Sequence, residues 1–189
     1  MADGGPLRRF AGRDLVIEER PERASIDLRG DPSDARFVRA LESVTDLRLP
    51  LEPCTSASGL LASIVWLGPD QWLVWSDTQA GEGLAQSLRV ALRGMASAVV
   101  DVSDARIVYA VGGSNARAVL AKGCSLDLHA RAFPVGRCAQ TLLAKVPILV
   151  QRVSTEPMFE LHVARSFRDY AWTWLQAAAS EYAAGAGDD

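Results

Sequence analysis

The chain is poor in the side chains that most often form reactive or metal-binding sites. Among 189 residues it has two histidines and three cysteines. The cysteines, Cys54, Cys124 and Cys138, are odd in number, widely spaced and without a C-x-x-C pair. We interpret them as reduced thiols that pack as small hydrophobes. Neither His129 nor His162 has a ligating residue at metal-binding spacing, so we expect no metal site in this chain.

A strong excess of one charge is also missing. Twenty Lys and Arg against 23 Asp and Glu give a formal net charge of -3, and the arginines are scattered along the chain. Such a chain has no field that would attract a phosphate backbone, so we expect no nucleic-acid partner. No apolar run follows Arg8 and Arg9 as a signal-peptide core or reaches the roughly 20 residues of a membrane span. We therefore expect a cytoplasmic protein with no membrane partner.

The composition that remains is that of a folded protein. Apolar residues make up 49% and charged residues 23% of the chain, which is ordinary for a globular domain and unlike disorder. We expect a flexible N-terminal arm over residues 1–12, where glycine and arginine are frequent, and a disordered tail over 184–189. Between them, residues 13–183 are predicted to form a single α/β domain of two pseudo-repeated halves.

The first half, about 23–103, alternates strands with helices. Its predicted elements are a strand at 23–30, a helix up to Val44, a loop at 45–58, two strands within 60–76, a helix at 82–93 and a strand at 97–103. Asp31 and Pro32 supply an N-cap and a first-turn proline for the first helix. A stripe of leucines predicts the second helix, which Gly94 closes. The order β-α-β-β-α-β is that of a split βαβ, ferredoxin-like unit.

The second half, about 106–183, repeats part of this pattern. Its predicted elements are a strand at 106–113, a helix from a Ser114 cap to Lys122, a crossing segment at 124–137, strands at 139–145, 147–153 and 158–164, and a helix at 167–182. The segment 26–38 is faintly similar to 108–119, which indicates an internal duplication. The predicted fold class is therefore α/β (α+β), with two related ferredoxin-like βαββαβ-type halves sharing one core.

Three motifs allow a functional interpretation beside a structural one. GGSNAR (112–117) joins a strand to a helix, but it lacks the third glycine of a dinucleotide fingerprint and the Gly-Lys-Ser/Thr of a P-loop, so a plain turn is favoured. Asp101 and Asp104 could be paired carboxylates for acid/base work, although turn capping explains them more simply. Cys124 and His129 could meet in space as a nucleophile pair, and nothing in the sequence favours this.

The final predicted helix carries an unusual number of aromatic residues. One apolar stripe at helical spacing consists of Phe167, Tyr170, Ala171, Trp174, Leu175 and Ala178. Trp172 lies about 160° round an ideal helix from Trp174, so the two cannot share one face. Trp172 either packs under a neighbouring loop or contacts a partner protein, and we take it as a partner-interface candidate. We expect no catalytic, cofactor-binding or metal-binding residue in the chain, which favours a role in binding or assembly.

Three segments resemble a known family. They are WLGPDQWLVWS (66–76), residues 99–152 and FELHVARSFRDYAWTWL (159–175), and the combination KGCSLDL, AFPVG and CAQTLLAKV is the most specific part. Over about 60–182 the chain is similar to the gamma subunit of heterotetrameric sarcosine oxidase. That family in turn resembles the folate-binding domain of the glycine-cleavage aminomethyltransferases, so the resemblance implies this fold.

Two departures from the aminomethyltransferase pattern bear on chemistry. Those enzymes carry a D-V-S-H segment, whereas this chain reads DVSD, with Asp104 in place of the histidine. They also place a G-G-x-x-D-D element in the following hairpin, where an acidic group assists methylene transfer to tetrahydrofolate. Here the hairpin is LLAKVPILV (142–150), which has no carboxylate. The resemblance therefore implies that the fold is kept and the chemistry is lost.

For the assembled protein the resemblance implies a non-catalytic, structural gamma subunit in a sarcosine oxidase-like flavoenzyme complex. The complex would demethylate sarcosine oxidatively to glycine, pass the one-carbon unit to tetrahydrofolate and form hydrogen peroxide. The implied partners are alpha, beta and delta subunits, which would hold the FAD, FMN, NAD, tetrahydrofolate and zinc, with none in this chain. Two alternatives stay open: the equivalent subunit of a related N-methyl amino acid oxidase or dehydrogenase complex, and a stand-alone folate-binding, aminomethyltransferase-like protein.

Overall fold

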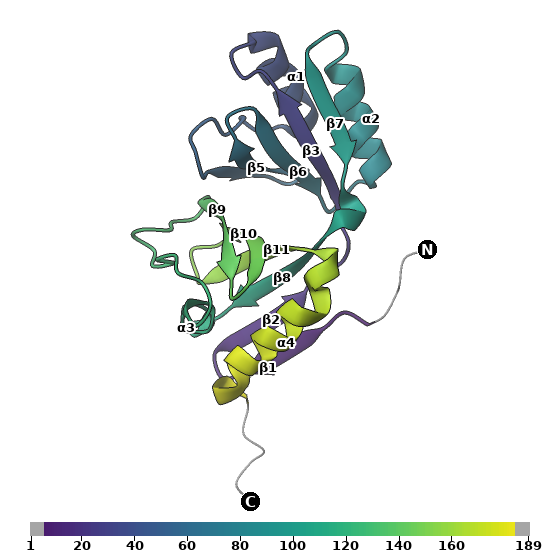
Figure 1. Cartoon of the computed structure of the whole chain (residues 1–189). Coiled ribbons are helices and arrows are strands. Elements are labelled where there is room, and N and C mark those ends of the chain that lie inside the picture. Colours follow the sequence, from purple (N-terminus) through teal and green to yellow (C-terminus); the bar gives the residue numbers. More distant parts are fainter. Residues whose placement is uncertain (1–5, 184–189) are drawn as a thin grey trace, which may run out of the picture. The chain divides into compact units, whose positions relative to one another are not determined.

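The computed structural model describes residues 6–183 and divides the chain into two compact units (Figure 1). The first unit consists of the described residues up to Pro21, Arg106–Val135 and those from Gln140 onward. The second consists of Glu22–Ala105 and Gly136–Ala139. Each unit is therefore built from segments that are far apart in the sequence. The predicted tail, 184–189, and the first five residues of the predicted arm lie outside the described residues.

The second unit is built on a five-stranded antiparallel sheet with the order β4-β5-β6-β3-β7. Its strands are β3 (Ala24–Gly30), β4 (Ser56–Ser58), β5 (Ser63–Gly68), β6 (Gln71–Ser76) and β7 (Ser97–Asp101). Helix α1 (Ala35–Thr45) joins β3 to the β4–β5 pair, and α2 (Gly81–Ala91) joins β6 to β7. Since β6 lies between β3 and β5, this is the split βαβ arrangement predicted for the first half.

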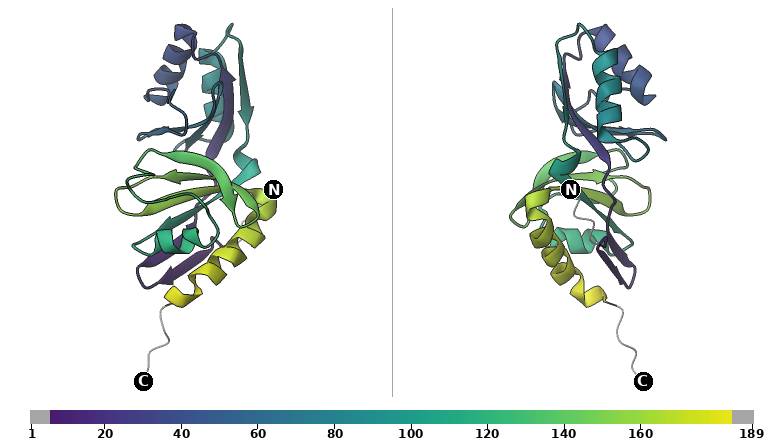
Figure 2. Two further views of the ribbon diagram at one scale, coloured as in Figure 1. Left: turned by 60° about the vertical axis from the view of Figure 1, so that its left-hand side comes forward. Right: turned by 90° about the vertical axis from the view of Figure 1, so that its right-hand side faces the viewer.

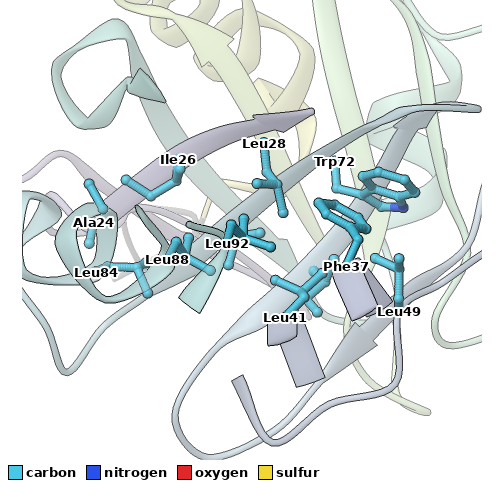
Figure 3. Close-up of a cluster of buried hydrophobic side chains, with 13 residues drawn as sticks. Ala24, Ile26, Leu28, Phe37, Leu41, Leu49, Trp72, Leu84, Leu88 and Leu92 are labelled. Atoms are coloured by element: carbon cyan, nitrogen blue, oxygen red, sulfur yellow. The ribbon is translucent and has the colours of Figure 1, made fainter. Parts of the chain in front are cut away.

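Helices α1 and α2 cover one face of this sheet and form its core with it (Figures 1 and 3). The leucine stripe predicted for α2 is confirmed, because Leu84, Leu88 and Leu92 are all buried. The Phe37 and Trp72 rings lie with their centroids 5.9 Å apart. Trp72 Nε1 donates a hydrogen bond of 2.8 Å to the backbone oxygen of Pro50, so the one polar atom of this large buried side chain is satisfied.

The start of α1 corrects the prediction that Asp31 and Pro32 begin it. Asp31 instead accepts hydrogen bonds from the backbone N–H and Oγ of Ser33, at 2.8 and 2.7 Å. The N-cap is Asp34, whose carboxylate accepts from the Arg36 N–H at 2.8 Å. The side-chain hydrogen bond from Arg36, with the bond from its backbone N–H, lowers the pKa of Asp34 to about 2. Asp31 and Asp34, three residues apart, are both suitable N-cap residues, and the helix begins after the one nearer to its apolar residues.

The predicted loop over 45–58 ends in a short edge strand. Ser56–Ser58 forms β4 and pairs antiparallel with β5, so that Ala57 lies opposite Ile64. Small polar residues have low strand propensity, and the pairing is supplied by the neighbouring strand. This is why the local sequence gives no signal for β4.

The first unit is built on a six-stranded sheet with the order β1-β2-β8-β11-β10-β9. Its strands are β1 (Arg9–Gly12), β2 (Leu15–Glu19), β8 (Arg106–Gly112), β9 (Cys138–Leu143), β10 (Val146–Arg152) and β11 (Met158–Ala164). Helix α3 (Ala116–Ala121) follows β8, and α4 (Arg168–Ala179) lies across one face of this sheet (Figure 2). The first two residues of β9 belong to the second unit.

Strand β1 corrects the prediction of a flexible arm over 1–12. It pairs antiparallel with β2, and Arg9 Nε lies 3.1 Å from Glu18 Oε1 across the pair. Leu15 and Ile17 of β2 are buried at alternate positions, which is the period-two pattern of a strand. The glycine- and arginine-rich composition of 1–12 indicates a loop. The alternation of buried residues in β2 is the signal that identifies the strand pair.

Gly30→Ala is expected to destabilise the second unit. A Cβ at position 30 would overlap the ring of Phe37, which is buried, and overpacking of this kind costs about 1–3 kcal/mol. The matched control is Gly83→Ala in α2, because nothing lies within 4 Å of the added Cβ there and alanine favours a helix by about 1 kcal/mol. Urea unfolding should show a lower midpoint for Gly30→Ala and an unchanged or higher one for Gly83→Ala. Equal midpoints would contradict the packing of Phe37 on β3.

Candidate functional site

Helix α4 presents the tryptophan that the sequence suggests as a partner contact. Its buried row consists of Ala171, Leu175, Ala178 and Ala179. Since successive residues are about 100° apart round a helix, Trp172 and Trp174 flank this row on opposite sides. Both are half-buried. The two tryptophans therefore occupy different faces, as predicted, but neither lies at the centre of the core.

Trp172 packs on strand β8. Its ring centroid lies 5.7 Å from that of Tyr109, with the rings tilted by 31°. Tyr109 is fully buried, and its hydroxyl donates a hydrogen bond of 3.0 Å to the backbone oxygen of Arg168 at the start of α4. Trp172 thus packs partly within the chain and is partly exposed. The hypothesis that its exposed part contacts a partner protein stays a prediction.

The apolar stripe predicted for α4 is only partly buried. Phe167 and Tyr170 belong to the predicted stripe, but they are 40% and 46% exposed. Phe167 belongs to the 3-10 turn η2 (Arg165–Phe167) rather than to α4. The buried row is narrow and consists largely of alanine. Wider side chains at the edges of the stripe are left outside this contact.

Trp174 covers the end of α3. A Cβ added at Gly123 would overlap the Trp174 ring, so this glycine provides the space in which the ring sits. The same glycine accepts a hydrogen bond of 2.8 Å from the N–H of Ala144 in the β9–β10 turn. Helix α4, the end of α3 and the hairpin therefore meet at Gly123.

A buried carboxylate holds the start of α4. Glu19 of β2 is 6% exposed, and its Oε1 accepts a hydrogen bond of 2.8 Å from Arg168 Nε. Arg8 Nε lies 3.8 Å from Glu19 Oε2, and Arg8 also bonds to Asp169 in the first turn of α4. The charges of the two arginines and the two carboxylates thus compensate each other.

Tyr109, which lies near these groups, has a raised pKa. Burial, and then the charge of Glu19, raise the pKa of Tyr109 to about 12, so Tyr109 stays protonated at neutral pH and is poorly suited to acid/base catalysis.

The GGSNAR segment is a strand-to-helix turn whose backbone donors are used internally. The Gly113 N–H donates to Pro157 O at 3.0 Å, and the Asn115 N–H donates to Asp14 O at 3.2 Å. The N-cap of α3 is Asn115, which corrects the prediction that Ser114 caps this helix. Asn115 makes no side-chain cap bond, and its side-chain Nδ2 donates a hydrogen bond of 3.0 Å to Arg13 O.

The DVSD segment forms a capped turn. Asp101 Oδ1 accepts hydrogen bonds from the backbone N–H and Oγ of Ser103, at 2.9 and 2.6 Å. Ser103 Oγ accepts in turn from the Ser25 N–H at 3.0 Å. Asp104 lies in the short 3-10 turn η1 that follows β7. The capping interpretation is therefore confirmed for Asp101.

The β9–β10 hairpin is where the family resemblance would place an acidic group. Its two-residue turn is formed by Ala144 and Lys145, and Ala144 has a left-handed φ of 52°. No aspartate or glutamate occurs over 142–150. The hairpin tip is fixed on Gly123 and has no carboxylate to offer a one-carbon carrier.

The candidate nucleophile pair is not brought together by a hydrogen bond. Cys124 is buried, whereas His129 Nδ1 accepts a hydrogen bond of 3.2 Å from the Arg131 N–H. His129 instead shares a hollow of about 360 Å³ with Ser114 and Arg117. Across residues 6–183 there is no group of three or more His, Cys, Asp or Glu arranged to hold a metal ion.

In that same part of the chain no helix is long and apolar enough to cross a membrane.

The two-unit architecture is that of aminomethyltransferase-like proteins. The aminomethyltransferase T of the glycine cleavage system from Bartonella henselae matches with a TM-score of 0.64 and 16% identity, over 87% of this chain and 46% of that one. At this identity the match shows the fold alone.

The comparisons also define the family. A family model described as "Sarcosine oxidase, gamma subunit family" matches residues 29–181. The gamma subunit of sarcosine oxidase from Arthrobacter sp is 34% identical over 172 residues, covering 89% of this chain and 82% of that protein. The gamma subunit from Corynebacterium sp. (strain P-1) is 34% identical over 159 residues, 84% of this chain and 76% of that protein. The chain belongs to the sarcosine oxidase gamma subunit family, which confirms the resemblance found in its sequence.

A solved structure extends the match to the whole fold. One chain of the heterotetrameric sarcosine oxidase from Corynebacterium sp. U-96, in complex with pyrrole 2-carboxylate, has a TM-score of 0.83 and 30% identity to this chain. The match covers 95% of this chain and 91% of that one. Both units described above therefore have counterparts within a single oxidase subunit.

Tyr109→Phe is expected to reduce the steepness with which the free energy of unfolding falls between about pH 10 and pH 12. A tyrosine in the unfolded chain ionises near pH 10, whereas folded Tyr109 keeps its proton to about 12. In this window the unfolded chain binds fewer protons, so the stability that Tyr109 contributes is complete below pH 10 and is lost as the pH rises. Urea unfolding midpoints from pH 9 to 12 check this, with Tyr170→Phe as the control for hydroxyl loss at an exposed site. Equal slopes for the wild type and Tyr109→Phe would contradict burial as the cause.

Proposed function

We propose that this chain is a non-catalytic, structural gamma subunit of a heterotetrameric sarcosine oxidase, assembled with alpha, beta and delta subunits. The observation that carries the proposal is the match of nearly the whole chain, 95% of it, to one chain of such an oxidase. Because the similarity extends over both units, it supports a shared role for the whole chain and not only a shared fold in one part of it.

The absence of catalysis in this chain is part of the proposal. The hairpin over 142–150 has no carboxylate, and Asp101 is engaged by both donors of Ser103. The buried Glu19 accepts a hydrogen bond from Arg168, so its Oε1 is engaged in holding the start of α4. At these three places the carboxylate is thus either missing or engaged in holding the structure.

In the proposed complex, sarcosine is demethylated oxidatively to glycine, the one-carbon unit passes to tetrahydrofolate, and oxygen is reduced to hydrogen peroxide. The FAD, FMN, NAD, tetrahydrofolate and zinc are held by the other subunits. A stand-alone aminomethyltransferase-like protein is not favoured, because the match to such an enzyme covers only 46% of its length at 16% identity.

The isolated chain is expected to be colourless and free of folate. Expressed alone, it should show no flavin absorbance above 350 nm and no heat of tetrahydrofolate binding in calorimetry at micromolar protein. Expressed with the alpha, beta and delta chains of the proposed complex, it should purify with three unlike partners in equal amounts. Stoichiometric flavin or folate on the chain alone would overturn the non-catalytic role, and failure to copurify would overturn the assembly.

Trp172→Ala is expected to weaken assembly more than it weakens the chain. A half-buried tryptophan lost to alanine costs the folded chain about 1–3 kcal/mol, less than the ~3–5 of a fully buried one, whereas an interfacial aromatic often contributes about 2 kcal/mol or more to binding. The matched control is Trp174→Ala, on the opposite flank of α4 and also half-buried. The two measurements are urea unfolding of the chain alone and retention of the partner chains on a tagged column. Equal retention for both variants would contradict a partner contact at Trp172.

A further inference from the structure

Two of the three cysteines are neighbours across a backbone bridge. Thr55 and Arg137 form an isolated antiparallel bridge. On one side of it the Ser56 N–H donates to Gly136 O at 2.7 Å, and on the other the Cys138 N–H donates to Cys54 O at 3.0 Å. Cys54 and Cys138 are therefore opposite one another in this bridge. All of these residues belong to the second unit.

The bridge brings the two cysteines within reach of a disulfide. Each Cα atom is only one or two covalent bonds from an atom of the 3.0 Å hydrogen bond between Cys138 N and Cys54 O, so the two Cα atoms are at most about 7 Å apart. Cys54 and Cys138 form the hydrogen-bonded type of pair, for which the Cα atoms of a regular antiparallel ladder are about 5.5 Å apart, and Cys54 has a left-handed φ of 62°. Native disulfides span about 4.4–6.8 Å between Cα atoms, and this range includes the separation of such a pair.

The two thiols differ in access to solvent. Cys54 is partly exposed, whereas Cys138 is 1% exposed. The Cys138 thiol lies 3.3 Å from Thr55 O, to which it donates. Burial, and then the nearby Cys54, raise the pKa of Cys138 to about 12. Cys138 is thus protected from direct oxidation, and Cys54 is the thiol that a small oxidant meets first.

We propose that Cys54 and Cys138 form a reversible, peroxide-driven disulfide, with Cys54 as the thiol that is attacked and Cys138 as the resolving thiol. Redox-sensitive cysteines commonly combine an accessible thiol with such a neighbour. The oxidant is a peroxide, of the kind that the proposed oxidase complex would release. The reaction itself requires only that a peroxide reach Cys54, so it does not depend on the proposed function.

The two steps balance as follows. The Cys54 sulfur attacks one peroxide oxygen, the O–O bond breaks, and the products are a sulfenic acid on Cys54 and one water. The Cys138 sulfur then attacks the Cys54 sulfur, the S–O bond breaks, and the departing hydroxide takes the Cys138 proton to form a second water. The two sulfurs together lose two electrons and the peroxide gains two. A dithiol reductant reverses the change by thiol–disulfide exchange.

The disulfide would fasten the short segment Gly136–Ala139 covalently to the rest of the second unit. In the reduced chain this segment is held there by the backbone bonds beside Thr55 and by the ion pair of Arg137 Nη1 with Glu52 Oε1, at 3.2 Å. A cross-link between 54 and 138 closes a long loop, and closing long loops in the unfolded chain stabilises the folded one. Oxidation is therefore expected to stiffen the second unit.

The test uses the full, reduced chain treated with hydrogen peroxide, followed by alkylation of the remaining thiols, intact mass measurement and peptide mapping. Wild type and Cys124→Ser should each lose two alkylatable thiols and yield one peptide pair that links 54 to 138. Cys54→Ser and Cys138→Ser should yield no such pair, and Cys138→Ala serves if the serine variant does not fold. A dithiol should restore the thiols.

A second readout separates a native disulfide from a chance one. Oxidised wild type and Cys124→Ser should unfold at higher urea than their reduced forms, and oxidised Cys54→Ser should unfold at the same urea as its reduced form. The proposal is overturned if the folded chain keeps all its thiols, if the cross-link involves Cys124, if Cys54 proceeds to sulfinic acid without a link, or if the link forms only in urea.

Discussion

The pairing of one buried carboxylate determines how the first unit is put together. Glu19 lies in β2, and a buried carboxylate is costly unless it is paired and hydrogen-bonded. Its partners come from distant parts of the chain, since Arg8 precedes β1 and Arg168 opens α4. Because this pairing and the Tyr109 hydroxyl fix where α4 begins, they also fix its rotation. The alanine-rich row then faces the sheet, and the two tryptophans are left on its flanks.

The sequence predicts the fold well where local pattern and tertiary packing agree. The leucine stripe of α2 is present in the structure, and so is the β-α-β-β-α-β order of the second unit, to which the structure adds the short edge strand β4. Prediction fails where two local solutions are equally good, as with Asp31 and Asp34, since only packing selects between them. It also fails where composition outweighs pattern, as in β1. Prediction also fails for Phe167 and Tyr170, which belong to the apolar stripe but are exposed. Their burial depends on how wide the surface beneath α4 is, and the spacing of apolar residues in the sequence does not give that width.

The candidate site is less accessible to sequence reasoning than the fold. The lack of a carboxylate over 142–150 can be read directly, and the capping role of Asp101 follows from short acidic side chains in turns. The pairs that organise the structure cannot be read in this way. Glu19 and Arg168 are 149 residues apart, and their spacing follows no helical or strand period. The chain thus has an aminomethyltransferase-like fold, and its family membership is what connects that fold to an oxidase.

The interleaving of the two units has a consequence for synthesis of the chain. Strand β2 is made early, but its neighbour β8 begins only at Arg106. At roughly 5–20 residues per second, the ribosome takes on the order of ten seconds to make the intervening residues. During that time the β1–β2 pair has an open edge of the kind that promotes aggregation. The second unit likewise lacks Gly136–Ala139 until late in translation. Neither unit can be completed as the chain emerges, so both must finish folding when most of the protein has been made.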